Sequence, residues 1–290
     1  MNSRLLLRVS ALLLLSVLFT SCKYRVHGRD RMTESDHEGT PAGSVVDYTV
    51  AEEASEHSEA VTAGGLEIPV MKSSRGQLLR RAGYTTQYNP ATRCPDWTAW
   101  HLTAAHTDGH VKRKSAEYQE DMQVPEPRAT RMDYFQAPYD RGHMCPAGDN
   151  KWSQQAMADC FLYTNMCPQN HDMNGGVWND LEMRCRTWAK QFGDIYIVCG
   201  PVYDSAAPAR YIGKNKIRVP DGFFKAVLCT QGKAKAIGFY YRNARGEGSI
   251  EDHAMSIRRL EQMTGIDFFP RLNRAVQDEI ETRYDYADWR

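Results

Sequence analysis

The four residues Asp140-Arg141-Gly142-His143 are the most informative stretch of this chain for its fold and function. A histidine follows a glycine and a charged pair, directly before the compact segment Met-Cys-Pro-Ala-Gly-Asp at 144–149. Histidine is the side chain whose ordinary pKa, about 6.5, lets it accept a proton near neutral pH. A single histidine is more often structural than catalytic, so the residues that accompany His143 decide its role.

Polar residues suited to acid–base and anion chemistry lie on both sides of His143. An amide-rich turn begins at Asn174, an acid follows at Glu182, and Arg113 lies upstream in a basic run. Each also has a plainer interpretation. Asn174 could cap a helix, Glu182 could be a solvated helix residue, Arg113 could face solvent, and Asn165 could be a turn residue. Only their combination and order indicate a shared site.

That combination resembles a known family. Asp140-Arg141-Gly142-His143 resembles the DRGH signature of the DNA/RNA non-specific endonucleases. Further blocks resemble the same family in the same order, and the resemblance covers roughly residues 84–272. These blocks are FLYTNMCPQ at 161–169, NGGVWNDLE at 174–182, YIVCGP at 196–201, the segment 213–225, and TGIDFFP at 264–270. Four residues alone would be a weak signal, whereas six ordered blocks are a specific one.

The resemblance implies a fold and a set of roles. The fold is α+β, with a central antiparallel sheet flanked by helices and a ββα-metal (His-Me finger) motif at the active site. His143 would be the general base. Asn174 would hold a hydrated Mg²⁺, or another divalent cation such as Mn²⁺, and Glu182 would bind that metal through water. The remaining implied site residues are Arg113 at the scissile phosphate, Arg141 in a similar or steadying role, and Asn165 near the active centre.

The implied activity is sequence-nonspecific endonuclease hydrolysis of phosphodiester bonds in DNA, RNA or both. Contacts would go to the backbone of the nucleic acid, because nothing in the sequence suggests a helix that reads bases. Two alternatives remain open at this point. One is a phosphodiesterase acting on a smaller ester, and the other is a non-catalytic surface lipoprotein that binds nucleic acid.

The N-terminal sequence predicts export and lipid anchoring. Residues 1–21 combine Arg4 and Arg8 with an apolar run too short to span a bilayer, which takes about 20 residues. Leu18-Phe19-Thr20-Ser21-Cys22 resembles a bacterial lipobox, which predicts cleavage before Cys22 and acylation of its thiol; an ordinary secretory peptide is the alternative. Residues 22–64 then read as a flexible tether, and residues 65–290 as the endonuclease domain.

The residues after Cys22 bear on location. Lys23-Tyr24 lack the aspartate that typically retains a lipoprotein at the inner membrane, so outer-membrane attachment is favoured. Whether the protein faces the periplasm or the cell surface is left open by the sequence, and no protein partner is implied.

Charge neither supports nor excludes nucleic acid as a partner. The whole chain balances 36 basic against 36 acidic residues. The segment 23–64 is acidic, and without the leader and this segment the remainder carries a net charge near +3. That value is well below what a dedicated DNA-binding protein shows. A local basic strip would suffice for an enzyme that cuts and releases its substrate.

Seven cysteines remain once Cys22 is assigned to lipid. In an exported protein several of them are expected to pair, and the odd number leaves at least one free thiol. The seven are Cys94, Cys145, Cys160, Cys167, Cys185, Cys199 and Cys229. A zinc site built from Cys145, Cys160 and Cys167 with His143 or His171 is an alternative, but no Cys-x-x-Cys pair supports it.

Periodicity predicts four strands and three helices around these motifs. The predicted strands are 97–102, 195–198, 223–229 and 236–241, with Gly200-Pro201 ending the second and Pro220-Asp221-Gly222 opening the third. The predicted helices are 177–192, 151–161 and 257–263. Gly193 and Gly265 follow the first and third as C-terminal caps. His143 would then lie in a loop or at a strand end, and Asn174 just before a helix.

Overall fold

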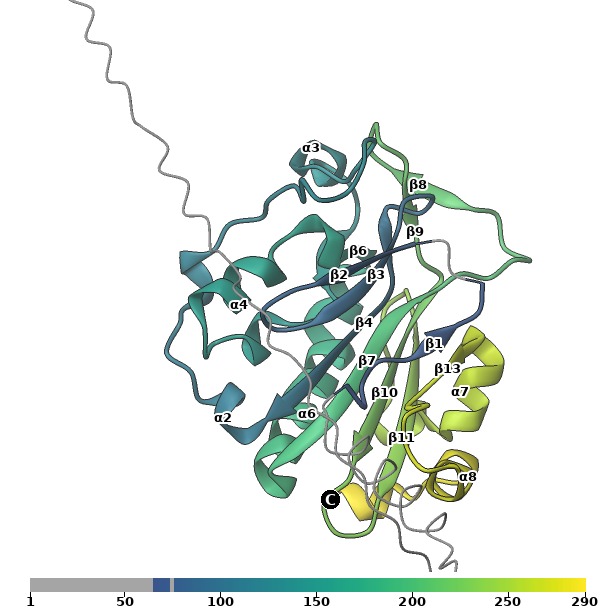
Figure 1. The fold of residues 1–290 in the computed structure, drawn as a ribbon. Helices are drawn as coiled ribbons and strands as arrows, with labels where there is room; N and C mark the ends of the chain where they lie inside the picture. The colour runs from purple at the N-terminus through teal and green to yellow at the C-terminus, as the bar shows by residue number, and fades with distance from the viewer. Residues whose placement is uncertain (1–64, 74–75) are drawn as a thin grey trace, which may run out of the picture. The chain divides into compact units, whose positions relative to one another are not determined.

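The computed structural model describes residues 65–73 and 76–290, so the predicted leader, lipid site and tether lie outside the described residues. Its centre is a seven-stranded sheet whose hydrogen-bonded order is β12-β11-β10-β7-β4-β3-β2, with every neighbouring pair antiparallel (Figure 1). The predicted α+β architecture is confirmed. The sheet strands are β2 (Gln77–Arg80), β3 (Thr85–Asn89), β4 (Cys94–Thr103), β7 (Asp194–Val202), β10 (Gly222–Cys229), β11 (Lys235–Arg242) and β12 (Ala254–Met255).

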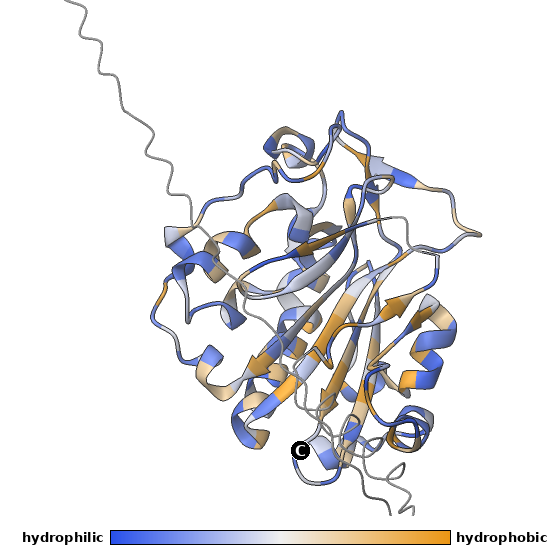
Figure 2. Cartoon of the chain, viewed as in Figure 1, coloured by the Kyte–Doolittle hydropathy of each residue, from blue (hydrophilic) through white to orange (hydrophobic). Residues whose placement is uncertain are grey.

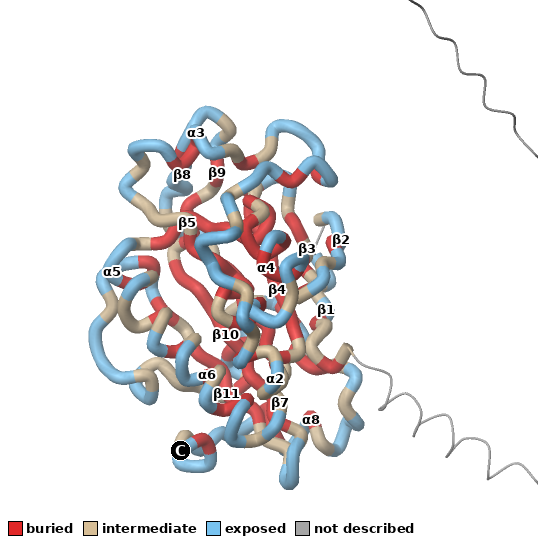
Figure 3. The backbone as a smooth tube through the Cα atoms, turned by 90° about the vertical axis from the view of Figure 1, so that its left-hand side faces the viewer, coloured by how far each residue is buried: buried red, intermediate tan, exposed pale blue. Residues whose placement is uncertain are grey.

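Both faces of the sheet are buried, and the side chains of β10 show why. Phe223, Val227 and Cys229 point into one hydrophobic cluster, whereas Phe224 and Leu228 point into the other. This alternation follows from the two-residue period of a strand. The central strands are apolar along much of their length (Figure 2), and they are buried while the loops around them are exposed (Figure 3).

Different helices cover the two faces. One face packs against α7 (Ile257–Thr264) and α8 (Arg274–Thr282), which Figure 1 shows beside β10 and β11. The other face packs against α6 (Asn179–Phe192) and α4 (Gln154–Cys160). Ser256 caps the start of α7, and Gly265 ends it with a φ of 68°, a conformation that glycine adopts without strain.

Short elements connect these layers, and three pairs of strands lie outside the main sheet. The strand pairs are β5 (Asp140–His143) with β6 (Met166–Gln169), β8 (Arg210–Ile212) with β9 (Ile217–Val219), and β1 (Val70–Met71) with β13 (Ile266–Asp267). The short helices are α2 (Ala104–Thr107), η1 (Arg113–Ser115), α3 (Arg131–Tyr134), η2 (Ala147–Asp149), η3 (Tyr163–Asn165), α5 (His171–Met173), η4 (Asn174–Trp178), η5 (Glu251–His253) and η6 (Tyr286–Trp289). No helix within the described ranges is both long and apolar enough to cross a membrane.

The four predicted strands and three predicted helices are present, with corrections to their ends. The helix predicted at 151–161 begins at Gln154, with Ser153 as its N-cap, and the strand predicted at 97–102 spans Cys94–Thr103. Strand β7 does not stop at Gly200-Pro201 but continues to Val202. Its pairing with β4 ends at Cys199, so Pro201 needs no donor on that side and is tolerated there. The helix predicted from Val177 begins at Asn179, because η4 precedes it as a wider turn in which Gly176 leaves helical geometry.

The expected disulfides are absent among the described residues. All seven cysteines there are free and buried. They behave as small apolar side chains, and the Sγ–H of Cys160 and of Cys199 donates to a backbone oxygen 3.1 Å away. Cys145, Cys160 and Cys167 also do not gather with His143 or His171 closely enough to share an ion. The prediction of several disulfides was therefore wrong for this domain.

Candidate active site

His143 ends strand β5, which pairs with β6 in register His143↔Met166 and Asp140↔Gln169. This ribbon and α6 together form the ββα arrangement that the resemblance implied. Gly142 is required inside the ribbon, because a Cβ there would lie 1.9 Å from Oε1 of Gln169. The glycine therefore leaves room beside His143 for the buried side chain of Gln169.

The imidazole of His143 is buried, with 7% of the residue exposed, and its Nε2 has no hydrogen-bond partner among the described residues. Its ring packs edge-on against Phe161, with centroids 4.9 Å apart. Burial, together with the charges of Arg113 and Arg141, lowers the pKa of His143 to about 3. The ring is consequently neutral at pH 7 and free to accept a proton, and an anion bound between the arginines would raise its pKa.

Two arginines flank this histidine and share one tyrosine. The guanidinium carbon of Arg141 lies 4.1 Å from the ring centre of Tyr118. Arg113 is exposed, lies 5.6 Å from the Phe161 ring centre, and reaches the Tyr118 hydroxyl at 3.5 Å. Neither arginine has a carboxylate partner in the described part of the chain. Two unneutralised guanidinium groups beside a neutral histidine form a site for an anion.

Asn174 is held in position by the first residue of the DRGH segment. Its Nδ2 donates to Oδ2 of Asp140 at 2.9 Å, and Nδ1 of His171 lies 3.0 Å from the same oxygen. This bond occupies the amide nitrogen of Asn174 and leaves its carbonyl oxygen as the atom available to a ligand. Asp140 therefore orients Asn174, while β5 orients His143.

Glu182 lies on α6 in the same cavity, above a buried lysine of the sheet. Burial raises the pKa of Glu182 to about 7, against the opposing charge of Lys225. Lys225 is 1% exposed, and its Nζ lies 4.4 Å from the ring centre of Trp178 and 5.2 Å from that of Trp100. A cation bound beside Glu182 would favour its ionised form, so the acid is suited to a metal's surroundings.

These side chains line one cavity of about 770 Å³. The structure brings His143, Arg113, Arg141, Asn174 and Glu182 together there, from four separate segments of the chain. The other lining residues are Tyr118, Tyr134, Tyr139, Asp140, Pro146, Ala147, Gly148, Lys151, Gly175, Asn179 and Arg186.

Asn165 is the one predicted site residue of the domain that does not line this cavity. It is fully buried, its Oδ1 accepts from the backbone N–H of Cys145, and its Nδ2 donates to the carbonyls of Cys145 and Cys160, each at 2.9 Å. Its side-chain amide is thus used in holding the backbone that follows His143. Asn165 acts as a positioning residue in this structure rather than as a ligand of the substrate.

Sequence reasoning missed Arg186 and Lys151, which also line the cavity. Arg186 donates to Oδ1 of Asp149 at 3.0 Å, and Trp100 donates to the other oxygen of that buried acid. Burial would lower the pKa of Arg186, but the Asp149 carboxylate outweighs it and raises that pKa. The signal available in the sequence was spacing, because Arg186 follows Glu182 by four residues and so shares its helix face.

The residues present fit a hard divalent cation. The cavity offers the amide oxygen of Asn174 and the carboxylate of Glu182, which are the oxygen ligands that Mg²⁺ prefers. Mg²⁺ keeps several of its own waters, so few protein oxygens suffice to hold it.

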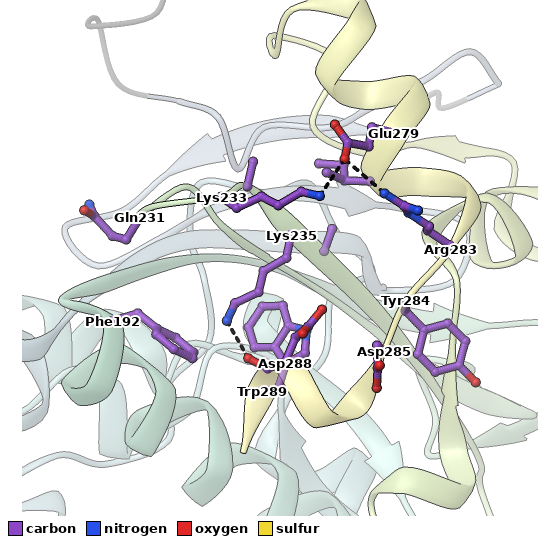
Figure 4. Close-up of a pocket in the computed structure, with 13 residues that line it drawn as sticks. Phe192, Gln231, Lys233, Lys235, Glu279, Arg283, Tyr284, Asp285, Asp288 and Trp289 are labelled. Atoms are coloured by element: carbon purple, nitrogen blue, oxygen red, sulfur yellow. Dashed lines mark hydrogen bonds and ion pairs between the residues drawn. The ribbon is translucent and has the colours of Figure 1, made fainter.

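A second cavity, of about 620 Å³, lies at the other end of the sheet among the β10–β11 turn, α8 and η6 (Figure 4). We call it the Lys235 pocket. Its Lys233 and Arg283 both reach Oε1 of Glu279, at 3.0 Å each. Lys235 donates to the backbone oxygen of Asp288 at 2.6 Å and lies over the rings of Phe192 and Trp289. None of the predicted site residues that the structure describes lines it.

Comparison with known proteins identifies the family of the chain. The model of the DNA/RNA non-specific endonuclease family matches residues 63–275. The chain belongs to that family. The mitochondrial nuclease EXOG of Xenopus laevis is 36% identical over 202 residues, which are 64% of this chain and 56% of that protein. Mitochondrial endonuclease G of Bos taurus is 32% identical over 209 residues, which are 68% of this chain and 70% of that protein.

A solved structure has the same fold. The EndoG chain of an EndoG/EndoGI complex aligns with a TM-score of 0.64 at 26% identity, covering 68% of this chain and 87% of that one. The chain spans only 56% to 62% of the length of the four EXOG nucleases that it matches.

Proposed function

We propose that this protein is a divalent-metal-dependent, sequence-nonspecific endonuclease that hydrolyses phosphodiester bonds of DNA and RNA. The observation that carries the proposal is the buried, neutral His143. Its Nε2 has no hydrogen-bond partner in the part of the chain that the structure describes, and it shares a cavity with two arginines, Asn174 and Glu182. Membership of the endonuclease family supports the same conclusion.

In the proposed reaction His143 is the general base. A water oxygen bonds to phosphorus while Nε2 of His143 takes the water's proton, and the bond from phosphorus to the 3′-oxygen breaks. Arg113 and Arg141 bind the phosphate oxygens and stabilise the charge that develops on them. Asp140 and Asn165 hold Asn174 and the His143 segment in position.

Asn174 would hold the metal directly, and Glu182 would orient the metal's waters. When bound, a Mg²⁺ supplies Lewis-acid stabilisation of the phosphate and a means of neutralising the leaving oxygen. Because these contacts go to the backbone of the nucleic acid, cleavage is expected to be independent of sequence and to weaken with salt.

The test uses the purified full chain with supercoiled plasmid and with RNA, each with Mg²⁺, with EDTA, and with the His143→Ala variant. Metal-dependent cutting of both substrates that is lost in the variant supports the proposal. A small phosphodiester such as bis-p-nitrophenyl phosphate distinguishes the nuclease from a phosphodiesterase that acts on small esters. Cutting of that ester but of neither nucleic acid would indicate the second.

We further propose that the protein is a lipoprotein anchored at Cys22, in the outer membrane and facing the periplasm or the medium. The support is the sequence at 18–22 and the absence of an aspartate after Cys22. Feeding cells an alkyne-labelled fatty acid should label the wild-type protein but not a Cys22→Ala variant. Release of the unlabelled variant from the membrane fraction would agree, and an unlabelled wild type would contradict the proposal.

A further inference from the structure

An exposed tryptophan lies one residue beyond the rim of the His143 cavity. Lys151 lines the cavity, and Trp152 follows it directly. Their backbone rests on the segment 106–111. The N–H of Val111 donates to the carbonyl of Lys151 at 3.0 Å, and a Cβ on Gly109 would lie 2.0 Å from that carbonyl oxygen. This close approach fixes the place of Trp152 relative to the cavity.

Trp152 is exposed and stacks on a neighbouring ring. It is 40% exposed, and few other large hydrophobic side chains in the described part of the chain are exposed. Its ring stacks on His106, with centroids 4.6 Å apart and planes 19° from parallel. Burial lowers the pKa of His106, so this ring is neutral at pH 7 and stacks as an uncharged aromatic. Within the described ranges His106 is the one ring stacked against Trp152, and 40% of the residue stays open to solvent.

The chain around Trp152 is basic. Lys112, Arg113, Lys114 and Lys151 are all exposed, and none has a salt-bridge partner in the part of the chain that the structure describes. An ordered indole beside unneutralised cations suits a ligand that combines negative charge with a flat aromatic group. A nucleic acid strand has both, since its phosphates repeat along the chain and every base presents a π face.

We propose that Trp152 is a stacking platform for one unpaired nucleobase of the strand whose phosphate lies in the His143 cavity. The substrate class that this selects is single-stranded DNA or RNA, because a base inside a duplex is already stacked and would have to leave its neighbours. His106 acts as a positioning residue that holds the indole ready and so lowers the entropy lost on binding. The inference rests on the proposed function, because it assumes that a nucleic acid strand enters the cavity.

The test is a thermodynamic cycle that combines the substitution Trp152→Ala in the protein with removal of bases from the nucleic acid. Wild type and Trp152→Ala are compared on a single-stranded oligonucleotide, on the same strand with abasic residues, and on its duplex. Binding is measured by fluorescence anisotropy in EDTA, and cleavage in Mg²⁺. In wild type, removing the bases should weaken binding by about fivefold to a hundredfold, the usual scale of one base on one aromatic ring. In Trp152→Ala the same removal should cost much less, and the preference for single strand over duplex should shrink.

Two further variants separate stacking from general damage. His106→Ala should weaken single-strand binding partially, and His106→Phe should restore it, because phenylalanine keeps a ring beneath the indole. Tyr284→Ala, which removes an exposed aromatic of the Lys235 pocket, is the matched control and should behave as wild type.

Several outcomes would overturn the inference. Equal effects of base removal in wild type and Trp152→Ala would show that no base stacks there. A change in molar mass of Trp152→Ala by light scattering would show that a second copy of the chain covers the indole instead. If the wild-type protein cuts nucleic acid and the variants bind and cut equally well, this inference is refuted but the proposed function stands. Wild type that neither binds nor cuts removes the proposed function as well.

Discussion

Two cavities of similar size, both lined by cations and aromatic rings, lie on opposite parts of this domain, and only one has the features of an active site. In the Lys235 pocket Lys233 and Arg283 share Glu279, and Lys235 is held by a backbone oxygen and two rings (Figure 4). In the His143 cavity Nε2 of His143 has no partner among the described residues, and the two arginines contact rings and a hydroxyl rather than acids.

This comparison shows that the volume of a cavity and its basic charge do not by themselves identify an active site. Buried polar groups are normally satisfied within the protein, and one that is left unsatisfied in the wall of a cavity keeps its bonding capacity for a ligand there. The Lys235 pocket has satisfied its own charges, whereas the His143 cavity keeps its hydrogen-bonding capacity for a substrate. The following predictions test that contrast, beginning with the largest expected effect.

His143→Ala should lower turnover at least about 100-fold, the usual scale for loss of a general base. Because Nε2 of the ring has no hydrogen-bond partner within residues 65–73 and 76–290, the fold should persist, and circular dichroism should be unchanged. The measurement is initial rate on plasmid and on RNA with Mg²⁺. A well-folded variant that cuts at nearly the wild-type rate would refute the assignment of His143 as base.

Arg186→Met should destabilise the domain by about 3 kcal/mol, because it leaves the buried carboxylate of Asp149 without its guanidinium partner. Urea unfolding measures the change. The control is the double variant Asp149→Asn with Arg186→Met, which removes the stranded charge and should recover part of the stability. Equal stability of wild type and the single variant would show that Asp149 is solvated rather than paired.

Asn174→Ala should weaken metal binding by at least about tenfold. Adding Mg²⁺ should raise the melting temperature of wild type and of His143→Ala, but should have little effect on Asn174→Ala. Since His143→Ala should be inactive but keeps Asn174, it separates metal binding from catalysis. A full Mg²⁺ response in Asn174→Ala would place the metal on other residues.

The depressed pKa of His143 predicts a loss of stability in acid. In the unfolded chain this group binds a proton below about pH 6.5, whereas in the folded protein it does so only near pH 3. The contribution of His143 to the free energy of unfolding should therefore fall by on the order of 1 kcal/mol for each pH unit below 6.5. His143→Gln, which cannot titrate, should lose less stability between pH 6.5 and 5 in urea unfolding. Identical slopes for the two proteins would mean that His143 charges freely in the folded state.

Glu279→Gln in the Lys235 pocket should have the smallest effect. Its partners Lys233 and Arg283 are exposed, so water replaces the lost contacts and neither turnover nor melting temperature should change measurably. A clear loss of nuclease activity in this variant would show that the two cavities are coupled.

Local sequence patterns predicted much of this fold. The four predicted strands have buried, β-prone side chains, and α6 and α7 have apolar faces at helical spacing with glycine caps, so the structure contains them all. Strands β2 and β3 and helix α8 were missed, because their patterns are mixed and their stability comes from packing against distant segments.

The sequence by itself determined the family, the chemical types of the site residues and the order in which they occur. Periodic patterns and turn residues act over a few positions, so a sequence displays them directly. Tertiary structure alone decided that the seven cysteines in the domain form no disulfides, that the side chain of Asn165 bonds to the backbone, and that Arg186 pairs with Asp149. It also decided that Trp152 stays exposed on top of His106. Each of these depends on contacts between segments far apart in the chain, and no local pattern encodes such distances.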